Sequence, residues 1–426
     1  MRKTTFMTMF LTITLLLSGC SDDEKYQEPA EKNNYTNTGL PVVYINTHSG
    51  EEVANKDVYE GATIEICDGN SKYNLNLQNI QIHGRGNSSW YTFIKKRSYT
   101  IKLDSKQGIL GMPKDKKWCL IANYRDKTML RNSVAWWLSA KLDIHNWTPR
   151  YRFVELVLNG THRGTYQLVE QVKIDDDRIN INEMSKYDTS PDKISGGYII
   201  ELDRGTNEDQ WEWIMPNMHG DVHKLSIKEP KIDDGNESQF KYIYSYLMNI
   251  DRLFGENKIA EVMENYIDME SWAAQWLIFE ISGTPEPNGP NSWYTYKDIN
   301  NDKWYCGPVW DFDYKSFIPS TSNNWINRNV IYMPEMLKYE PFRETLKEVW
   351  SRIKPMLPEL IAFIEQEGRL IELSEKLNWE IHNKNLIEDN RTENGDEFVS
   401  PQAARIMMID YLKAKWEFID NNLENI

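Results

Sequence analysis

Residues 280–313 read EISGTPEPNGPNSWYTYKDINNDKWYCGPVWDFD, and they bring acidic and amide side chains together at spacings that suit a chemical site. Residues 292–297 and 303–310 are rich in aromatic residues and flank an Asp- and Asn-rich turn, which predicts a β-hairpin. Folding about this turn places Asn291 beside the Trp-Asp-Phe-Asp end of the return strand. Alternation along that strand puts its two carboxylates on one face and its two aromatic rings on the other.

The two carboxylates are Asp311 and Asp313, and with Asn291 they offer oxygen ligands to a hard cation. Magnesium in particular prefers one or two carboxylates together with substrate phosphates. Glu286 precedes Asn291 by five residues, the interval that separates the catalytic base from a metal-binding Asn in protein kinases. The alternative is an exposed turn with solvated acids, because a motif match is only a hypothesis.

Length and charge narrow the class of protein. The chain has 426 residues, which predicts two or three domains or lobes. Its formal net charge is −15, from 64 acidic and 49 basic residues. An acidic chain is a poor partner for a phosphate backbone, so nucleic acid is not an expected ligand.

The N-terminus has the features of a lipoprotein. Residues 1–19 combine a basic start with a short apolar run, which predicts a signal peptide. The Leu-Ser-Gly-Cys ending at Cys20 resembles a bacterial lipobox and implies lipid attachment to that thiol, and residues 20–39 predict a flexible tether. The acidic residues after Cys20 resemble an export signal of Gram-negative lipoproteins. The expected location is the bacterial cell envelope, at the outer membrane and the cell surface, with the lipid as the only membrane contact.

Residues 40–185 predict a β-rich N-terminal lobe with one long helix at residues 126–142. A glycine turn at residues 84–90, GRGNSSW, precedes an alternating strand that carries Lys102. Backbone N–H groups of such a turn and a nearby ammonium group can surround phosphates. The alternatives are an ordinary turn and a lysine on a solvated strand face.

Residues 195–426 predict a C-terminal lobe that contains the acidic hairpin. Helical patterns precede the hairpin, and amphipathic helices from residue 335 onward predict a scaffold. No second apolar stretch is long enough to span a membrane.

Several segments, in this order, resemble the CotH (spore coat protein H) family of atypical protein kinases. They are GRGNSSW, KKRSYTIKLD, KKWCLIANYRDKTMLRNSVAWWL, VELVLNGTHRGTYQLVEQV, GGYIIELD and SWYTYKD with GPVWDFD. Each is ordinary alone, but the ordered set covers residues 42–317 and is specific. The resemblance implies an α+β, protein-kinase-like two-lobed fold with a helical C-terminal region, and phosphate transfer from ATP to protein serine residues.

The resemblance also implies roles for single residues. Asp311 and Asp313 match the WD-x-D motif and are expected to hold Mg²⁺ or Mn²⁺ with Asn291. Glu286 is the expected base, although the family pattern has Asp there, and one extra methylene displaces the carboxylate. The expected nucleotide contacts are Arg85, Gly86, Lys102 and Glu170, of which Lys102 is also a candidate catalytic residue.

Two other functions fit the same residues. The 16 Trp and 23 Tyr offer stacking platforms for a glycan-binding or catalytically inactive kinase-like lipoprotein. Paired carboxylates also occur in glycoside hydrolases, at separations of about 5–5.5 or 6.5–9.5 Å. The sequence names neither the acceptor protein nor the oligomeric state.

Overall fold

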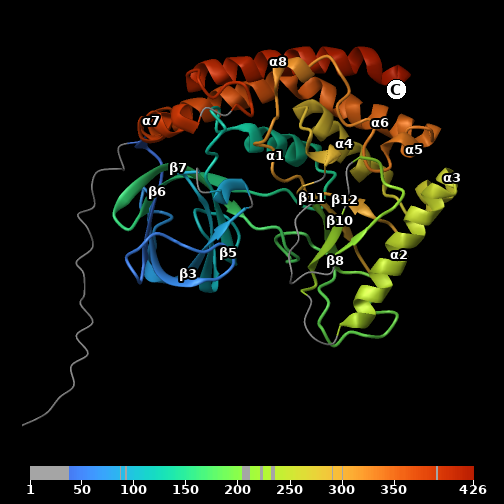
Figure 1. Ribbon diagram of the computed structural model, residues 1–426, viewed down its shortest axis with the longest axis horizontal. Helices are drawn as coiled ribbons and strands as arrows, with labels where there is room; N and C mark the ends of the chain where they lie inside the picture. Colours follow the sequence, from blue (N-terminus) through green and yellow to red (C-terminus); the bar gives the residue numbers. More distant parts are fainter. Residues whose placement is uncertain are drawn as a thin grey trace, which may run out of the picture. The chain divides into compact units, whose positions relative to one another are not determined.

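Seven strands of the N-terminal half close into a β-barrel in the computed structural model of the protein (Figure 1). The structure describes residues 38–86, 88–91, 94–203, 212–220, 224–231, 236–289, 291–299, 301–389 and 392–426, so the predicted signal peptide and Cys20 lie outside the described residues. The barrel strands are β1 (Val42–Thr47), β2 (Glu60–Cys67), β3 (Leu75–Arg85), β4 (Ser98–Gln107), β5 (Asp115–Ile121), β6 (Tyr151–Leu158) and β7 (Thr161–Glu170).

The predicted protein-kinase-like two-lobed fold is wrong. Strand β1 pairs in parallel with β6, with Val42 opposite Glu155, and this pairing closes the sheet on itself. The rest of the chain forms a separate five-stranded sheet and a set of helices. Alternation within a strand predicts which face is buried but not which strand pairs with it. The sequence therefore did not show that the barrel closes.

The barrel interior follows the predicted alternation. Ile101 and Leu103 of β4 point into the apolar core of the barrel, where Trp118 and Leu120 of β5 also lie. Lys102 therefore points outward from the same strand. The outer face of β3, β4 and β5 is where the polar residues discussed below are found.

The second sheet has the strand order β12-β11-β8-β10-β9. Its members are β8 (Tyr198–Asp203), β9 (Glu212–Ile214), β10 (Lys224–Glu229), β11 (Trp293–Lys297) and β12 (Tyr305–Cys306). The predicted hairpin forms between β11 and β12, but its return strand was predicted too long. Residues 307–313 leave the sheet, where Gly307 has a φ of 111° and Asp311 a φ of 66°.

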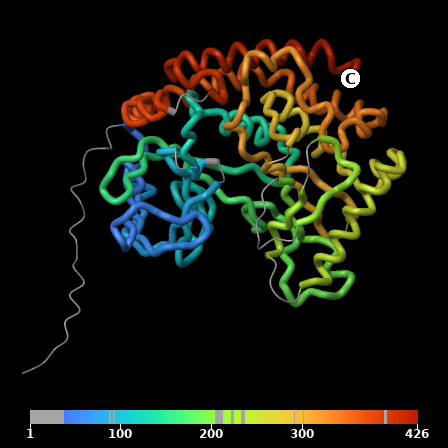
Figure 2. The backbone as a smooth tube through the Cα atoms, viewed as in Figure 1, coloured from blue at the N-terminus to red at the C-terminus, as the bar shows by residue number. Residues whose placement is uncertain are grey.

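Helices make up most of the remaining chain, as the tube in Figure 2 lets the reader trace. They are α1 (Arg131–Leu142), α2 (Glu237–Gly255), α3 (Ile259–Asn265), α4 (Met269–Ser282), α5 (Met333–Met336), α6 (Glu340–Ile353), α7 (Leu357–Asp389) and α8 (Pro401–Asn422). Short 3₁₀ turns are η2 (Ser88–Trp90), η3 (Glu286–Asn288), η4 (Pro319–Thr321), η5 (Lys354–Met356) and η6 (Leu423–Asn425).

Helix α4 is buried along its whole length except at its start, and it contacts α1, α6, α8 and β12. Such a helix is apolar on all sides because every side packs on protein. Helix α7 lies on β7 of the barrel and also contacts α1 and α8. No helix in the described part of the chain is long and apolar enough to cross a membrane.

The predicted helix at residues 126–142 begins five residues later, at Arg131. Asp126 stays outside the helix, and its carboxylate accepts hydrogen bonds from the backbone N–H groups of Thr128 and Arg131, each at 3.0 Å. An acidic group in this position satisfies N–H groups that have no partner within the helix.

Candidate active site

Asp311 and Asp313 lie in the segment that leaves the second sheet after β12. Asp311 is exposed and Asp313 half-buried, while Trp310 and Phe312 are buried. The Phe312 ring stacks on Phe279 of α4 with 5.2 Å between centroids. The predicted separation of acids from rings is therefore present, although a positive φ at Asp311 produces it and not a strand. A non-glycine residue with positive φ is uncommon, and such outliers cluster at functional sites.

Helix α1 fixes the backbone of this segment. The Phe312 N–H donates to Asn132 Oδ1 at 2.7 Å. The Trp136 Nε1–H donates to the Val309 carbonyl at 3.3 Å, and the Trp136 ring packs against Trp310 with 6.0 Å between centroids. Contacts on both sides of Asp311 therefore hold it in place before any ligand arrives.

The Asp311 and Asp313 carboxyl groups lie close enough together to interact. Burial raises the pKa of Asp313 well above its usual range, and the negative charges of Asp311 and Asp126 raise it further. Ser292 Oγ donates to Asp311 Oδ2 at 3.3 Å. Two carboxylates that repel each other at a partly desolvated site are stabilised by a shared proton or by a bound cation.

The donor set fits a cation that is also bound to phosphate. In the part of the chain that the structure describes, no group of three or more His, Cys, Asp or Glu residues could hold a metal ion. The protein thus offers the Asp311 and Asp313 pair, and magnesium commonly takes its other ligands from water and substrate phosphates.

Arg85, at the end of β3, brings a positive charge from the barrel to this pair. Its guanidinium lies over the Trp310 ring, 5.2 Å from the centroid, and donates to Cys119 Sγ. Burial acts to lower the pKa of Arg85, but Cys119, Tyr294 and Asp311, among other groups, raise it above the ordinary arginine value. Of the predicted nucleotide contacts, Arg85 is the one that the structure places beside Asp311.

Lys102 lies further along the same outer barrel face. It is half-buried, and its ammonium group stands 5.5 Å from the centroid of the Tyr59 ring. Burial and the nearby Cys119 raise the pKa of Tyr59 to about 12, while Arg85 acts to lower it. Arg85, Tyr59 and Lys102 therefore form one continuous polar wall, which faces the second sheet through the interactions of Arg85 with Glu201 and Tyr294.

Glu286 and Asn291 both lie on the chain segment before β11. Glu286 opens η3 and is half-buried. The pKa of Lys315 is raised mainly by Tyr314, with smaller contributions from the charges of Glu393 and Glu286. Asn291 is half-buried and directly precedes Ser292, the residue that contacts Asp311.

Glu170 lies in a different setting from the other predicted site residues. It is fully buried at the end of β7, with Arg150 Nε at 2.9 Å and Arg178 Nη1 at 2.6 Å from its carboxylate oxygens. Burial raises the pKa of Glu170, and the two arginines act against that shift. The carboxylate is thus already neutralised by protein partners, and its assignment to the nucleotide stays a prediction.

The glycine turn has a packing reason of its own. A Cβ on Gly84 would lie 1.7 Å from the Trp90 ring, so that ring packs directly on the bare backbone. Gly86 is exposed with a φ of 92°, a conformation that favours glycine. Gly84 is therefore explained without a phosphate, whereas Gly86 stays a candidate contact because it follows Arg85.

Sequence reasoning missed the polar network beneath the site. Arg131 is buried and pairs with Asp126, and its Nη2 lies 2.7 Å from Asp396 Oδ2. Its Nε donates to the Ser316 carbonyl at 3.1 Å, so it ties helix α1 to the segment after Asp313. The available signal was the Arg131-Asn132 pair, two polar residues on a helix whose buried positions are mostly apolar or small.

Comparison with known proteins identifies the family. No curated protein matches the chain. The family model described as CotH kinase protein matches residues 80–355, which is more than half of the 426 residues and contains Arg85, Lys102, Glu286, Asn291, Asp311 and Asp313. The chain therefore belongs to the CotH kinase protein family.

Proposed function

We propose that this protein is a metal-dependent kinase that transfers the γ-phosphate of ATP to a hydroxyl group of another protein. The observation that carries the proposal is the interaction between the Asp311 and Asp313 carboxyl groups beside the Arg85 guanidinium. This arrangement offers a cation site and a positive side chain at one place, which phosphoryl transfer requires because its catalysis is mostly positioning and charge stabilisation.

Each residue has a defined task in this proposal. Asp311 and Asp313 would hold Mg²⁺ or Mn²⁺ with Asn291, and the cation would offset charge on the phosphate oxygens. Arg85 would contact the phosphate beside the metal. Glu286 would accept the proton of the acceptor hydroxyl as its oxygen forms a bond to the γ-phosphorus and the bond to the ADP oxygen breaks.

The glycan-binding alternative is less well supported. Among the described residues, no tryptophan is exposed, and Trp118, Trp272 and Trp276 are fully or almost fully buried. Sugar binding through stacking needs accessible rings, whereas these tryptophan rings pack in the cores of the barrel and the helical region. The exposed aromatic rings among the described residues include those of Tyr91, Tyr187 and Tyr314.

A labelling experiment tests the kinase proposal. Residues 21–426 are incubated with γ-labelled ATP and Mg²⁺ or Mn²⁺, and we expect protein labelling that disappears with chelator. Asp302→Asn is the matched control, because Asp302 is an exposed carboxylate in the turn between β11 and β12. Equal labelling with and without metal, or no labelling of wild type and of candidate acceptor proteins, would reject the proposal.

We also propose that the protein is anchored to the cell envelope through lipid on Cys20. Replacing Cys20 by Ala removes the thiol that would carry the lipid, so we expect the variant protein to move from the membrane fraction to the soluble fraction. The measurement is fractionation after a high-salt wash, with Cys67→Ala as the control. A Cys20→Ala protein that stays in the membrane fraction contradicts lipid anchoring.

A further inference from the structure

Three lysines gather at the end of the outer barrel face that lies away from Asp311. Lys102 of β4 and Lys117 of β5 stand opposite each other in the strand register. Lys231, which follows β10 of the second sheet, lies close enough to Lys117 for the two positive charges to interact. Cationic side chains from three segments thus meet where the barrel faces the second sheet.

Among the described residues, few carboxylates lie close to these lysines. Glu229 is half-buried, and its carboxylate interacts with Lys231, Lys117 and Lys173. Lys173 has its own partner, since its Nζ lies 3.3 Å from Asp115 Oδ2. Among the described residues, Glu229 is therefore the carboxylate that interacts with both Lys117 and Lys231, and Glu183 lies next to it.

Burial, followed by the charges of Lys231 and Lys102, lowers the pKa of Lys117 to about 8, while Glu229 acts in the opposite direction. Like charges in contact at a partly desolvated site destabilise one another. A bound anion would relieve this repulsion and would be held by charge-assisted hydrogen bonds.

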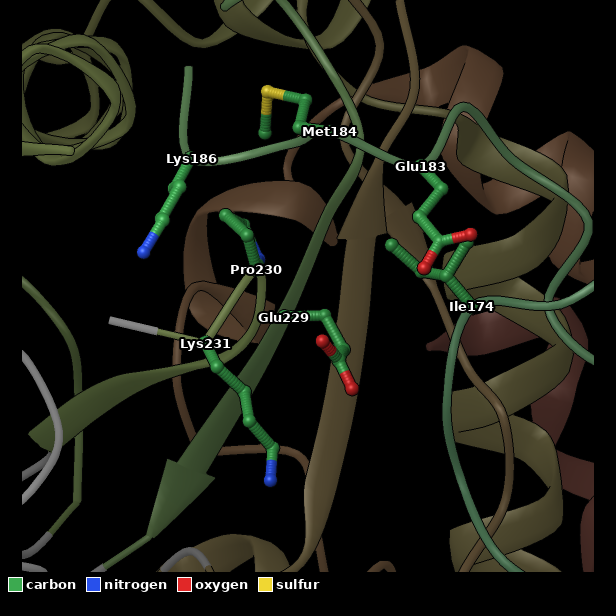
Figure 3. Close-up of a pocket in the computed structure, with 7 residues that line it drawn as sticks. All are labelled: Ile174, Glu183, Met184, Lys186, Glu229, Pro230 and Lys231. Carbon is green, nitrogen blue, oxygen red and sulfur yellow. The ribbon is translucent and has the colours of Figure 1, made fainter. Parts of the chain in front are cut away.

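A small cavity opens directly beside the cluster (Figure 3). Its volume is about 180 Å³, and Lys231, Glu229 and Pro230 form one side of it while Lys186 and Glu183 come from the segment after the barrel. In Figure 3 the side chains of Glu229 and Lys231 extend in the same direction from neighbouring positions. Pockets for drug-sized ligands begin at about 300 Å³, so this cavity suits a compact group.

The strand register separates this cluster from the metal-site end of the wall. Arg85, which lies beside Asp311, pairs with Ser98, and Lys102 is four residues further along β4. At ~3.3 Å per residue, the two positions are ~13 Å apart along the strand. One phosphate group therefore cannot contact a cation held by Asp311 and Asp313 and also contact Lys117.

We propose that Lys102, Lys117 and Lys231 form a second anion site that takes a phosphate group and connects the barrel to the second sheet. The site needs neither a divalent metal nor Asp311, and so it does not depend on the proposed kinase activity. The phosphate group has two chemical sources, the nucleotide or an anionic group on the acceptor protein.

The test is calorimetric titration of the purified protein with inorganic phosphate, at low salt and without divalent metal. We expect binding by wild type that weakens by at least about tenfold in Lys117→Gln and in Lys231→Gln, because each variant loses a charged hydrogen-bond donor. Lys116→Gln is the matched control, since Lys116 is an exposed neighbour on β5 and the change in net charge is the same. Thermal melts of each variant establish that the fold is retained.

Competing ligands distinguish the two sources. If ATP displaces phosphate and adenosine does not, the site takes a phosphate of the nucleotide. If phosphate still binds in saturating ATP, the site takes an anionic group of the acceptor. The proposal is overturned if wild type does not bind phosphate, or if Lys117→Gln and Lys231→Gln bind it as well as Lys116→Gln. Asp311→Asn should bind phosphate normally, so a failure of the kinase proposal would appear separately, as absent metal-dependent labelling.

Discussion

Asp311→Asn is expected to abolish the thermal stabilisation that ATP with Mg²⁺ or Mn²⁺ gives to the wild-type protein, and to leave the melting temperature without ligand almost unchanged. The substitution keeps the volume of the side chain and much of its hydrogen bonding but removes the charge that binds the cation. A ligand that binds only the folded state stabilises it in proportion to its affinity, so loss of metal binding appears directly in the melt.

The fold should tolerate this change because the Asp311 side chain is exposed. Surface substitutions usually change stability by about 0.5 kcal/mol or less in either direction. Within this range we expect a small gain in stability, since the variant removes one of the charges that raise the pKa of Asp313. Asp302→Asn should keep the full ligand response. An unchanged response in Asp311→Asn would reject Asp311 as the metal ligand, and a collapsed melt without ligand would identify its carboxylate as structural.

The pH dependence of the metal response has a defined sign. The pKa of Asp313 in the folded protein lies above the ordinary Asp value of 3.8, so between those two pKa values the folded protein holds a proton that the unfolded chain has lost. Stability without metal therefore falls as pH rises through this window. Metal binding must displace the same proton, so the stabilisation by metal should grow as pH rises, and melts at a series of pH values measure both effects. A metal response that weakens with rising pH would contradict a site at Asp311 and Asp313.

Local patterns in the sequence predicted the individual elements well. The alternating residues of β4 and the strand β11 lie where periodicity and turn chemistry indicate them. These features depend on neighbours in the sequence, which the sequence displays directly. The separation of Asp311 from its flanking aromatic rings was also predicted, although strand alternation was the wrong reason for it.

Features that depend on distant residues were not predictable. The barrel closes through a β1–β6 pairing, and nothing within either strand specifies its partner. The contact of Arg85 with Cys119 and Trp310 joins three separated segments. The end of β12 at Cys306 also escaped prediction, because the following aromatic residues continue a strand-like pattern while their side chains pack against α1 and α4.

Replacing Arg131 in its buried polar network is expected to have the second large effect. Arg131 lies between Asp126 and Asp396, all three side chains are buried, and Asn132 beside it holds the Phe312 N–H. Burial raises the pKa of Asp396, and Arg131 acts to lower it, so without the guanidinium this carboxylate is left without its main counter-charge. Removing one partner of a buried ion pair typically costs about 3–5 kcal/mol.

Arg131→Met should therefore lower the free energy of unfolding, measured by urea titration, by about 3–5 kcal/mol. It should also abolish phosphate transfer, because the segment that carries Asp311 and Asp313 loses its attachment to α1 through the Ser316 carbonyl. Arg369→Met is the matched control, since Arg369 is exposed and pairs only loosely with Glu365, at 3.9 Å, so its unfolding curve should overlay that of wild type. Adding Asp396→Asn to Arg131→Met removes one of the two unpaired charges and should recover part of the lost stability.

Equal unfolding curves for Arg131→Met and Arg369→Met would mean that the network does not stabilise the fold. Full stability loss with retained phosphate transfer would mean that it does not position the carboxylates.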